Sequence, residues 1–315
     1  MSGDKSQPAN LEQVLRLAVA SSSTSEEPAS SMQPMTAERT QFLQTVLSSM
    51  SGTNHIQRMK MIIAHCCSSE SSKENLCDAL EELSDWCEDI DMACDFHKVG
   101  GFIIFTTLLR HEDDGVKSKC AELIANLCQN NPYCQEKLLE TNEMNRLMEM
   151  TGSPRETPLI RTKALYALSG LLRGNMTCQE HFVKSDGFSL LLKSMQRDDN
   201  KICTKASFLL MSLMRDQPKF KDELAKMGFV EQLTIILTKE HKAEHEHVMA
   251  ALLELCTGCQ LALHEAQRSE FGLQDLLASR ISLLHEQPES EEELDYMKRL
   301  KQLLSKQLND DVIDR

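Results

Sequence analysis

The sequence predicts an all-α fold built as a solenoid of repeated helical units. The first observation is a stretch with small or aliphatic residues at fixed places, clearest in residues 163–171 (Lys-Ala-Leu-Tyr-Ala-Leu-Ser-Gly-Leu). Similar stretches start at Asp78, Lys119, Lys205 and His247, so the copies follow one another at steps of 41 to 44 residues. This period is typical of the armadillo and HEAT class of solenoids. We therefore expect an armadillo-repeat, right-handed superhelical solenoid whose core holds Leu127, Leu171, Leu213 and Leu255.

Two further observations agree with a helical solenoid. A glycine-containing break follows most copies, as Gly100-Gly101, Asp186-Gly187 and Met227-Gly228, and glycine suits the tight turn between two helices. The second copy has Asn142-Glu143 at this place instead. Aromatic residues make up only 4% of the chain, and leucine, methionine and alanine form its apolar stripes. This composition favours packed helices over sheets.

Taken in order, the chain is expected to have four parts. Residues 1–35 are a flexible segment with a short amphipathic helix that starts near Asn10, followed by a linker rich in serine, glutamate and proline. Residues 36–73 form an N-terminal helical cap, and residues 74–286 form the armadillo-like repeats. Residues 287–315 form a capping helix, expected to end near Leu308, and a tail. The caps cover the apolar ends that a solenoid would otherwise expose.

Charge and composition narrow the partners and the compartment. The formal net charge is −14, which disfavours binding to nucleic acid, and no apolar run is long enough to cross a membrane. The first ten residues lack the apolar core of a secretory signal. We therefore predict a monomeric protein of the cytoplasm, with the nucleus as a second compartment. Its twelve cysteines are then reduced and act as small packing residues.

The motif search gives no reason to expect an enzyme, a cofactor or a metal site. There is no glycine-rich phosphate loop, no GxSxG and no HExxH. Cys256 and Cys259 form a single CxxC, but a zinc site needs two further ligands, so packing is the favoured interpretation. The sequences around Leu273 and Leu300 match LxxLL docking boxes, yet the same spacing fits a buried helix face. We expect the function to be protein binding.

The repeats also predict a binding groove. In an armadillo unit the repeated stretch is the third helix, and residues three, seven and ten places after each start share the side that faces the groove. This groove is predicted to change from acidic in the first units to aromatic and basic in the middle. Exposed aromatic and arginine side chains are typical of interaction hot spots. The predicted groove residues are Glu81, Asp85, Glu88, Glu122, Asn126, Gln129, Tyr166, Arg173, Phe208, Ser212 and Arg215.

Several ordered stretches resemble one family of proteins, the armadillo-type cytosolic nucleotide exchange factors that bind heat-shock protein 70. The resemblance lies in residues 10–15 (Asn-Leu-Glu-Gln-Val-Leu), 25–28, 186–188, 205–210 and 244–248, and in the tail from Asp310. It implies a co-chaperone that grips the ATPase domain of heat-shock protein 70, chiefly its second lobe, in the concave groove. The grip opens the nucleotide cleft, so that ADP leaves and bound client protein is released, and chaperone cycling is thereby inhibited or reset. No catalytic residue is needed for this role.

The resemblance also gives the N-terminal helix a use. A tethered segment, residues 10–20, would occupy the substrate-binding domain of the chaperone and keep released clients from rebinding, with Leu11, Val14, Leu15 and Leu17 as the mimic of a client. The other interpretation is a helix that folds back onto the first repeat. For the whole protein, the alternative is an armadillo adaptor that binds a peptide, for example for a ubiquitin ligase, without affecting nucleotide exchange.

Overall fold

The computed structural model describes residues 53–68, 71–285 and 290–313. The chain divides into two units, Met1–Gly52 and Thr53–Arg315, and the second unit contains everything described below. The amphipathic helix expected near Asn10 and the beginning of the cap at residue 36 lie outside the described residues. The boundaries expected at residues 35, 73 and 286 stay predictions.

The second unit is helical, and no strand occurs in its described residues, which confirms the all-α class. The helices, in chain order, are α3 (Thr53–Cys66), α4 (Lys73–Trp86), α5 (Ile90–Lys98), α6 (Ile103–Leu108), α7 (Asp114–Cys128), α8 (Pro132–Leu139), α9 (Glu143–Gly152), α10 (Pro158–Leu172), α11 (Met176–Lys184), α12 (Gly187–Met195), α13 (Asn200–Asp216), α14 (Lys219–Lys226), α15 (Phe229–Thr238), α16 (His245–Cys256), α17 (Gln260–Ala266), the 3-10 turn η1 (Ser269–Phe271), α18 (Leu273–Leu284) and α19 (Glu291–Ile313).

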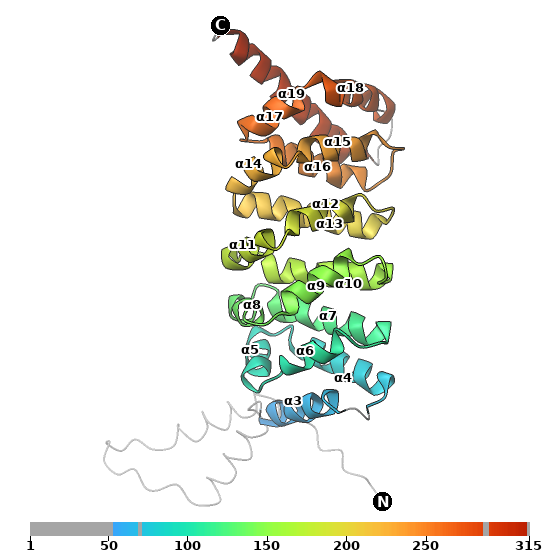
Figure 1. Cartoon of the computed structure of the whole chain (residues 1–315), viewed down its shortest axis with the longest axis vertical. Coiled ribbons are helices and arrows are strands. Elements are labelled where there is room, and N and C mark those ends of the chain that lie inside the picture. The colour runs from blue at the N-terminus through green and yellow to red at the C-terminus, as the bar shows by residue number, and fades with distance from the viewer. Residues whose placement is uncertain (1–52, 69–70, 286–289, 314–315) are drawn as a thin grey trace, which may run out of the picture. The chain divides into compact units, whose positions relative to one another are not determined.

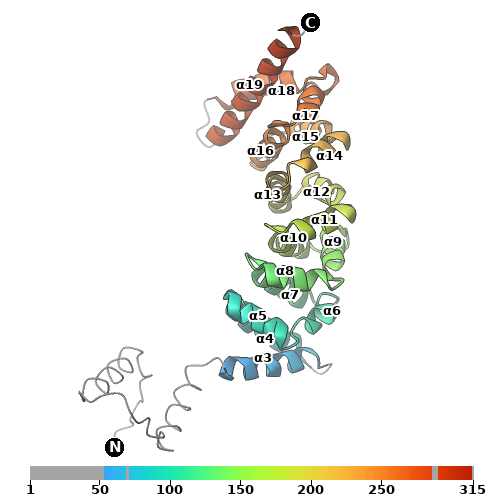
Figure 2. The same cartoon turned by 90° about the vertical axis from the view of Figure 1, so that its left-hand side faces the viewer.

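From α5 onward the helices form five trios, each with a short first helix, a second helix and a long third helix. The first helices α5, α8, α11, α14 and α17 lie above one another in one column of the second unit (Figure 1). The third helices α7, α10, α13, α16 and α19, together with α4, pack against their neighbours in a separate layer on the concave side of the stack (Figure 2). This is the arrangement that the 41- to 44-residue period predicted.

The core follows the repeated stretch. Leu127, Leu171, Leu213 and Leu255 are each at most 1% exposed, as predicted. Because every third helix packs between two others, the apolar stripe of one unit continues into the next. A single hydrophobic core therefore runs through the described part of the second unit.

The corners between first and second helices use glycine in two different ways. Gly100 and Gly228 have φ values of +85° and +79°, a left-handed backbone that favours glycine. At the third corner Asp186 takes the left-handed conformation with φ +64°, and Gly187 is needed because a Cβ there would lie 2.4 Å from the ring of Phe182. The irregular second corner has no left-handed residue. There the Thr141 hydroxyl donates to the Leu138 carbonyl at 2.6 Å and accepts from the Glu143 amide at 3.2 Å.

The C-terminal end and the cysteines complete the description. The last helix continues to Ile313, beyond Leu308 where the sequence predicted its end. All twelve cysteines are free thiols, and Cys256 and Cys259 are both buried in the core, as packing residues are. The two LxxLL boxes contribute Leu273, Leu277, Leu300 and Leu304 to the core. In the described part of the chain, no helix is long and apolar enough to span a membrane.

Candidate partner-binding groove

The groove residues are held by third helices with well-defined beginnings. The Asp113 side chain accepts from the amides of Gly115 and Val116 and starts α7. Thr157 accepts from the Ile160 amide and starts α10. Asp199 caps α13 in the same way as Asp113 caps α7. Because N-cap side chains satisfy amides that have no partner inside the helix, they fix where each helix starts and hence which residues face the groove.

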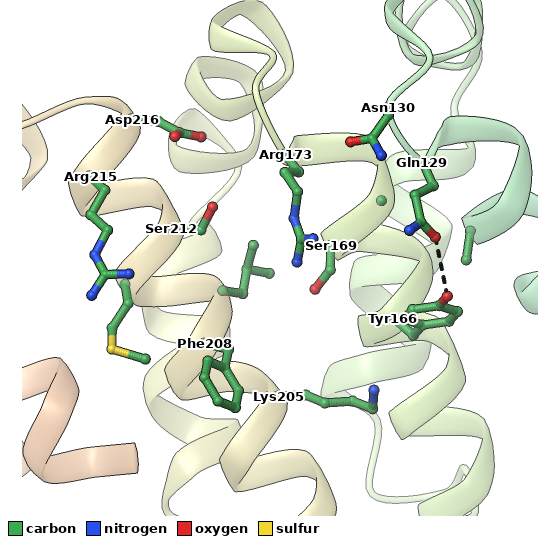
Figure 3. Close-up of a pocket in the computed structure, with 14 residues that line it drawn as sticks. Gln129, Asn130, Tyr166, Ser169, Arg173, Lys205, Phe208, Ser212, Arg215 and Asp216 are labelled. Carbon is green, nitrogen blue, oxygen red and sulfur yellow. Dashed lines mark hydrogen bonds between the residues drawn. The ribbon is translucent and has the colours of Figure 1, made fainter. Parts of the chain in front are cut away.

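A hollow of about 420 Å³ lies in the middle of the groove, between α10 and α13. Figure 3 shows its walls, with Tyr166 and Arg173 on one side and Phe208 and Arg215 on the other. Phe208 is 52% exposed, although it is a large apolar side chain. Its ring lies 4.8 Å from the ring of His247, centroid to centroid. An exposed aromatic side chain beside cations is the kind of surface that partner proteins contact. The hollow includes six of the predicted groove residues: Gln129, Tyr166, Arg173, Phe208, Ser212 and Arg215.

The cations of this central hollow differ in whether a carboxylate neutralises them. Arg215 Nε lies 2.9 Å from Glu254 Oε2. Burial works against ionisation of Glu254, but hydrogen bonds from Lys221 and Arg215 hold its pKa below the ordinary value. Lys205 Nζ lies 4.9 Å above the ring of Tyr166 and has no carboxylate partner among the described residues. Burial, and next the neighbouring Lys163, lower the pKa of Lys205.

Arg173 is the exposed cation of the hollow without such a partner. It follows the last turn of α10, and within the described ranges its guanidinium makes no ion pair and no hydrogen bond to a side chain. In Figure 3 it extends toward Ser169, in the space between α10 and α13. The structure thus separates the two arginines that the sequence pattern treated as equivalent: Arg215 is already engaged, and Arg173 is free to bind a partner's carboxylate.

Two of the carboxylates predicted for the first part of the groove form ion pairs with lysines. Glu122 Oε1 lies 2.6 Å from Lys163 Nζ, and Glu81 Oε2 lies 3.0 Å from Lys119 Nζ. In both pairs the glutamate belongs to one repeated stretch and the lysine is the first residue of the next stretch. Ion pairs between consecutive third helices therefore neutralise these two carboxylates. The sequence pattern gave each residue a place on its own helix but could not show this pairing.

The other residues predicted for this part also lie at the groove. Glu88, Asn126, Gln129 and Tyr166 line a second hollow of about 370 Å³, which shares Gln129, Asn130 and Tyr166 with the central one. Asn126 Nδ2 donates to the Ser84 hydroxyl at 2.9 Å, and the Tyr166 hydroxyl donates to Gln129 Oε1 at 3.5 Å. Asp85 is exposed and lines neither hollow. The predicted residues thus share one continuous face, with Asp85 at its margin.

Groove residues at the C-terminal end were missed by the sequence analysis. A third hollow of about 260 Å³ lies next to Phe208 and Arg215 and is lined by Glu246, His247, Glu254, Glu292, Tyr296 and Arg299, among others. Burial raises the pKa of Glu246, and the nearby Glu292 acts in the same direction. The fifth repeated stretch, which starts at His247, already indicated that α16 would contribute. The residues that α19 contributes become visible only in the structure, because the repeated stretch does not show which residues of α19 face the groove.

A row of buried side chains along the first helices holds the groove helices together; we call Gln135, Gln179 and Lys221 the bridging row. Gln135 Nε2 donates to the carbonyls of Cys128 at 3.1 Å, Gly170 at 2.9 Å and Arg173 at 3.1 Å, so it connects the ends of α7 and α10.

The other two members also bond to the ends of third helices. Gln179 Nε2 donates to the Leu172 carbonyl at 2.9 Å and to Asp216 Oδ2 at 2.7 Å, which connects α10 to α13. Lys221 Nζ reaches Glu254 and the Thr257 carbonyl, each at 2.8 Å, at the end of α16. Gln135 and Gln179 are at most 1% exposed, and Lys221 is 8% exposed. The repeated stretch alone does not predict this row, although the pattern Asn-x-x-Cys-Gln, which ends at Gln135 and again at Gln179, is visible in the sequence.

Within the described residues, no group of three or more histidine, cysteine, aspartate or glutamate side chains is placed to hold a metal ion. The stacked trios and the continuous groove instead define an armadillo-type binding protein. A designed armadillo repeat protein in complex with the peptide (KR)4 has a similar fold, with a TM-score of 0.65 at 15% identity over 78% of this chain and 99% of its own.

Sequence relatives identify the family within this class. The family described as SIL1/FES1/HPBP1 C-terminal domain matches residues 92–226, and the one described as nucleotide exchange factor Fes1 matches residues 11–96. Hsp70-binding protein 1 of Mus musculus is 32% identical over 100% of this chain and 91% of its own length. The Homo sapiens protein of that name is also 32% identical, over 98% and 89%. The chain belongs to the Hsp70-binding protein 1 family, as the sequence resemblance predicted.

Proposed function

We propose that this protein is a co-chaperone that acts as a nucleotide exchange factor for heat-shock protein 70. The observation that carries the proposal is the match of residues 11–96 to the nucleotide exchange factor Fes1 family, together with the full-length similarity to Hsp70-binding protein 1. The groove, with its exposed aromatic ring and its free Arg173, supports a role in protein binding. The role requires binding and no chemical step by this chain.

The ATPase domain of the chaperone, and chiefly its second lobe, is the proposed ligand of the groove. A factor accelerates nucleotide release only if it binds the open, nucleotide-poor state more tightly than the closed one. By linkage, ADP then weakens the binding of the factor by the same ratio, and each tenfold ratio corresponds to about 1.4 kcal/mol. Release of ADP lets ATP enter, and the chaperone then releases its client.

A rigid groove suits this mechanism. The bridging row joins the end of α7 to α10 and the end of α10 to α13, and it holds the end of α16 on α14. Buried hydrogen bonds of this kind are costly to break. The ion pairs Glu81–Lys119 and Glu122–Lys163 connect the same layer on its groove side. The groove therefore keeps its shape, and a partner with two movable lobes changes its own shape to fit it. Binding energy can then hold the two lobes apart.

Release of labelled ADP from the purified ATPase domain tests the proposal. Full-length protein should speed the release, and excess ADP should weaken the complex. Binding without any faster release would instead favour the adaptor alternative, a solenoid that only recognises a peptide. The designed armadillo relative that binds (KR)4 gives that alternative a precedent. The free cations Arg173 and Lys205 in the central hollow disfavour a basic peptide here.

Residues 10–20 are proposed to contact the substrate-binding domain of the chaperone. The support is the presence of the apolar residues Leu11, Val14, Leu15 and Leu17 in this segment and its position within the stretch that matches the Fes1 family. Deletion of residues 1–35 should leave ADP release unchanged and slow the release of a labelled client peptide. Equal peptide release by both forms would contradict this role. We further propose that one chain acts on one chaperone, in the cytoplasm.

A further inference from the structure

Two cysteines from neighbouring trios meet at one buried asparagine. Cys94 belongs to α5 and Cys134 to α8, and these first helices pack against each other (Figure 1). Asn131 Nδ2 lies 3.2 Å from Cys134 Sγ and 3.8 Å from Cys94 Sγ. Asn131 is 2% exposed, and its Oδ1 also accepts from the Cys134 amide at 3.2 Å as the N-cap of α8. The two sulfur atoms are thus held on the same side-chain amide.

The two thiols differ in their access to solvent. Cys94 is half-buried, whereas Cys134 is fully buried. Burial, and next the neighbouring Cys94 thiol, raise the pKa of Cys134 to about 12. A small oxidant can therefore reach the half-buried Cys94 first, and the buried Cys134 can act second.

The geometry points to a modification site: we propose that Cys94 and Cys134 form a disulfide when the protein meets hydrogen peroxide. In the first step the Cys94 thiolate attacks one peroxide oxygen, the O–O bond breaks, and hydroxide leaves and takes up a proton. In the second step the Cys134 sulfur attacks the sulfur of the Cys94 sulfenic acid and gives up its proton. The S–O bond breaks, and the oxygen leaves as water. Two thiols are oxidised by two electrons in total, and one peroxide becomes two waters.

Other cysteines lack this combination of access and a partner. Cys67 is exposed, and the cysteine next to it in the sequence is Cys66. Because the side chains of consecutive helical residues do not face each other, these two thiols are not placed to pair. Cys256 and Cys259 are both buried, and Cys259 Sγ donates to Asp222 Oδ1 at 3.2 Å. Cys128 is fully buried at the end of α7. Oxidation by a small peroxide should therefore select the pair at Asn131.

The disulfide would join the first helices, α5 and α8, of the first two trios. It closes a long loop and thereby restricts the unfolded chain, so the oxidised protein should melt at a higher temperature than the reduced one. It would also fix the angle between the first two trios. The proposal concerns the thiols of this chain and does not depend on the proposed exchange function.

The test uses the folded full-length protein, treated with a small excess of hydrogen peroxide and then alkylated. We expect loss of two free thiols per chain, their recovery with dithiothreitol, and fragment spectra that place the link between residues 94 and 134. The variants C94S and C134A should each abolish the link. The matched controls C87A and C128A should keep it, which excludes the other two cysteines at the same trio boundary. A link through any other pair, or sulfinic acid at Cys94 with no link in the wild type, would overturn the proposal.

Discussion

The groove layer and the bridging row are both formed by the repeated helical units, but polar side chains are exposed in the groove and buried in the row. In the groove, Arg173 is exposed and Phe208 is half exposed, with room for a partner between them. In the bridging row, Gln135 and Gln179 are sealed from solvent, and each donates to at least two acceptors. Polar groups that are buried must be satisfied within the chain, whereas exposed ones remain available to a partner.

The two regions meet in the same residues. The carbonyl of Arg173 accepts a hydrogen bond from Gln135, while its guanidinium lies in the central hollow. Asp216 accepts from Gln179 and also lines that hollow. The row therefore positions the backbone from which groove side chains extend. Stability and binding should be separable by mutation, with the row controlling the first and the groove side chains controlling the second.

The largest expected effect comes from the core on which both regions depend. Leu171→Ala should lower the free energy of unfolding by ~2–5 kcal/mol, because it leaves a cavity between packed third helices. Urea unfolding followed by circular dichroism measures the change. Leu159→Ala is the matched control, since Leu159 lies on the same helix but is 54% exposed. Equal losses in the two variants would show that burial in α10 is not what stabilises the stack.

The next effect tests the bridging row. Gln179→Ala should cost about 1–3 kcal/mol of stability, because it leaves the Leu172 carbonyl and Asp216 without their buried donor. Gln196→Ala is the control: Gln196 Nε2 also donates to an amide oxygen, that of Gln232 at 3.0 Å, but on the exposed surface. Its loss should stay within about 0.5 kcal/mol. A Gln179 variant as stable as its control would remove the structural role of the row.

The third prediction concerns binding alone. Arg173→Glu should weaken the complex with the chaperone ATPase domain at least about tenfold, or ~1.4 kcal/mol. The substitution removes the unpaired cation of the hollow and puts a negative charge there, which repels a carboxylate of the partner. The melting temperature should hardly change, since Arg173 is exposed. Titration calorimetry measures the affinity, with Lys193→Glu on α12 as a control of equal charge change. Arg215→Gln should have a smaller effect than Arg173→Gln, because Glu254 already engages Arg215.

Much of the fold could be predicted from the sequence, and less of the chemistry of the site. The period placed Leu127, Leu171, Leu213 and Leu255 in the core because burial repeats with the helical unit. The same period placed Tyr166, Arg173 and Phe208 on one face. It could not show that Glu122 pairs with Lys163 or Arg215 with Glu254, because those contacts depend on the distance and rotation between neighbouring units.

The smallest expected effect tests whether the paired acids of the first groove units matter to the partner. The Glu122–Lys163 pair is partly exposed, with 32% and 27% of the two side chains accessible. A double-mutant cycle with Glu122→Gln and Lys163→Met should therefore give a coupling energy of about 0.2–1 kcal/mol in stability. The coupling energy should decrease as the salt concentration is raised, because ions screen exposed charges.

The affinity of the double variant for the ATPase domain should stay within about threefold of the wild type, since the two charges already neutralise each other. A tenfold loss of affinity with Glu122→Gln alone would contradict this expectation. It would mean that the Glu122 carboxylate leaves Lys163 and binds the partner. The first units of the groove would then form an acidic binding site, as the sequence pattern indicated.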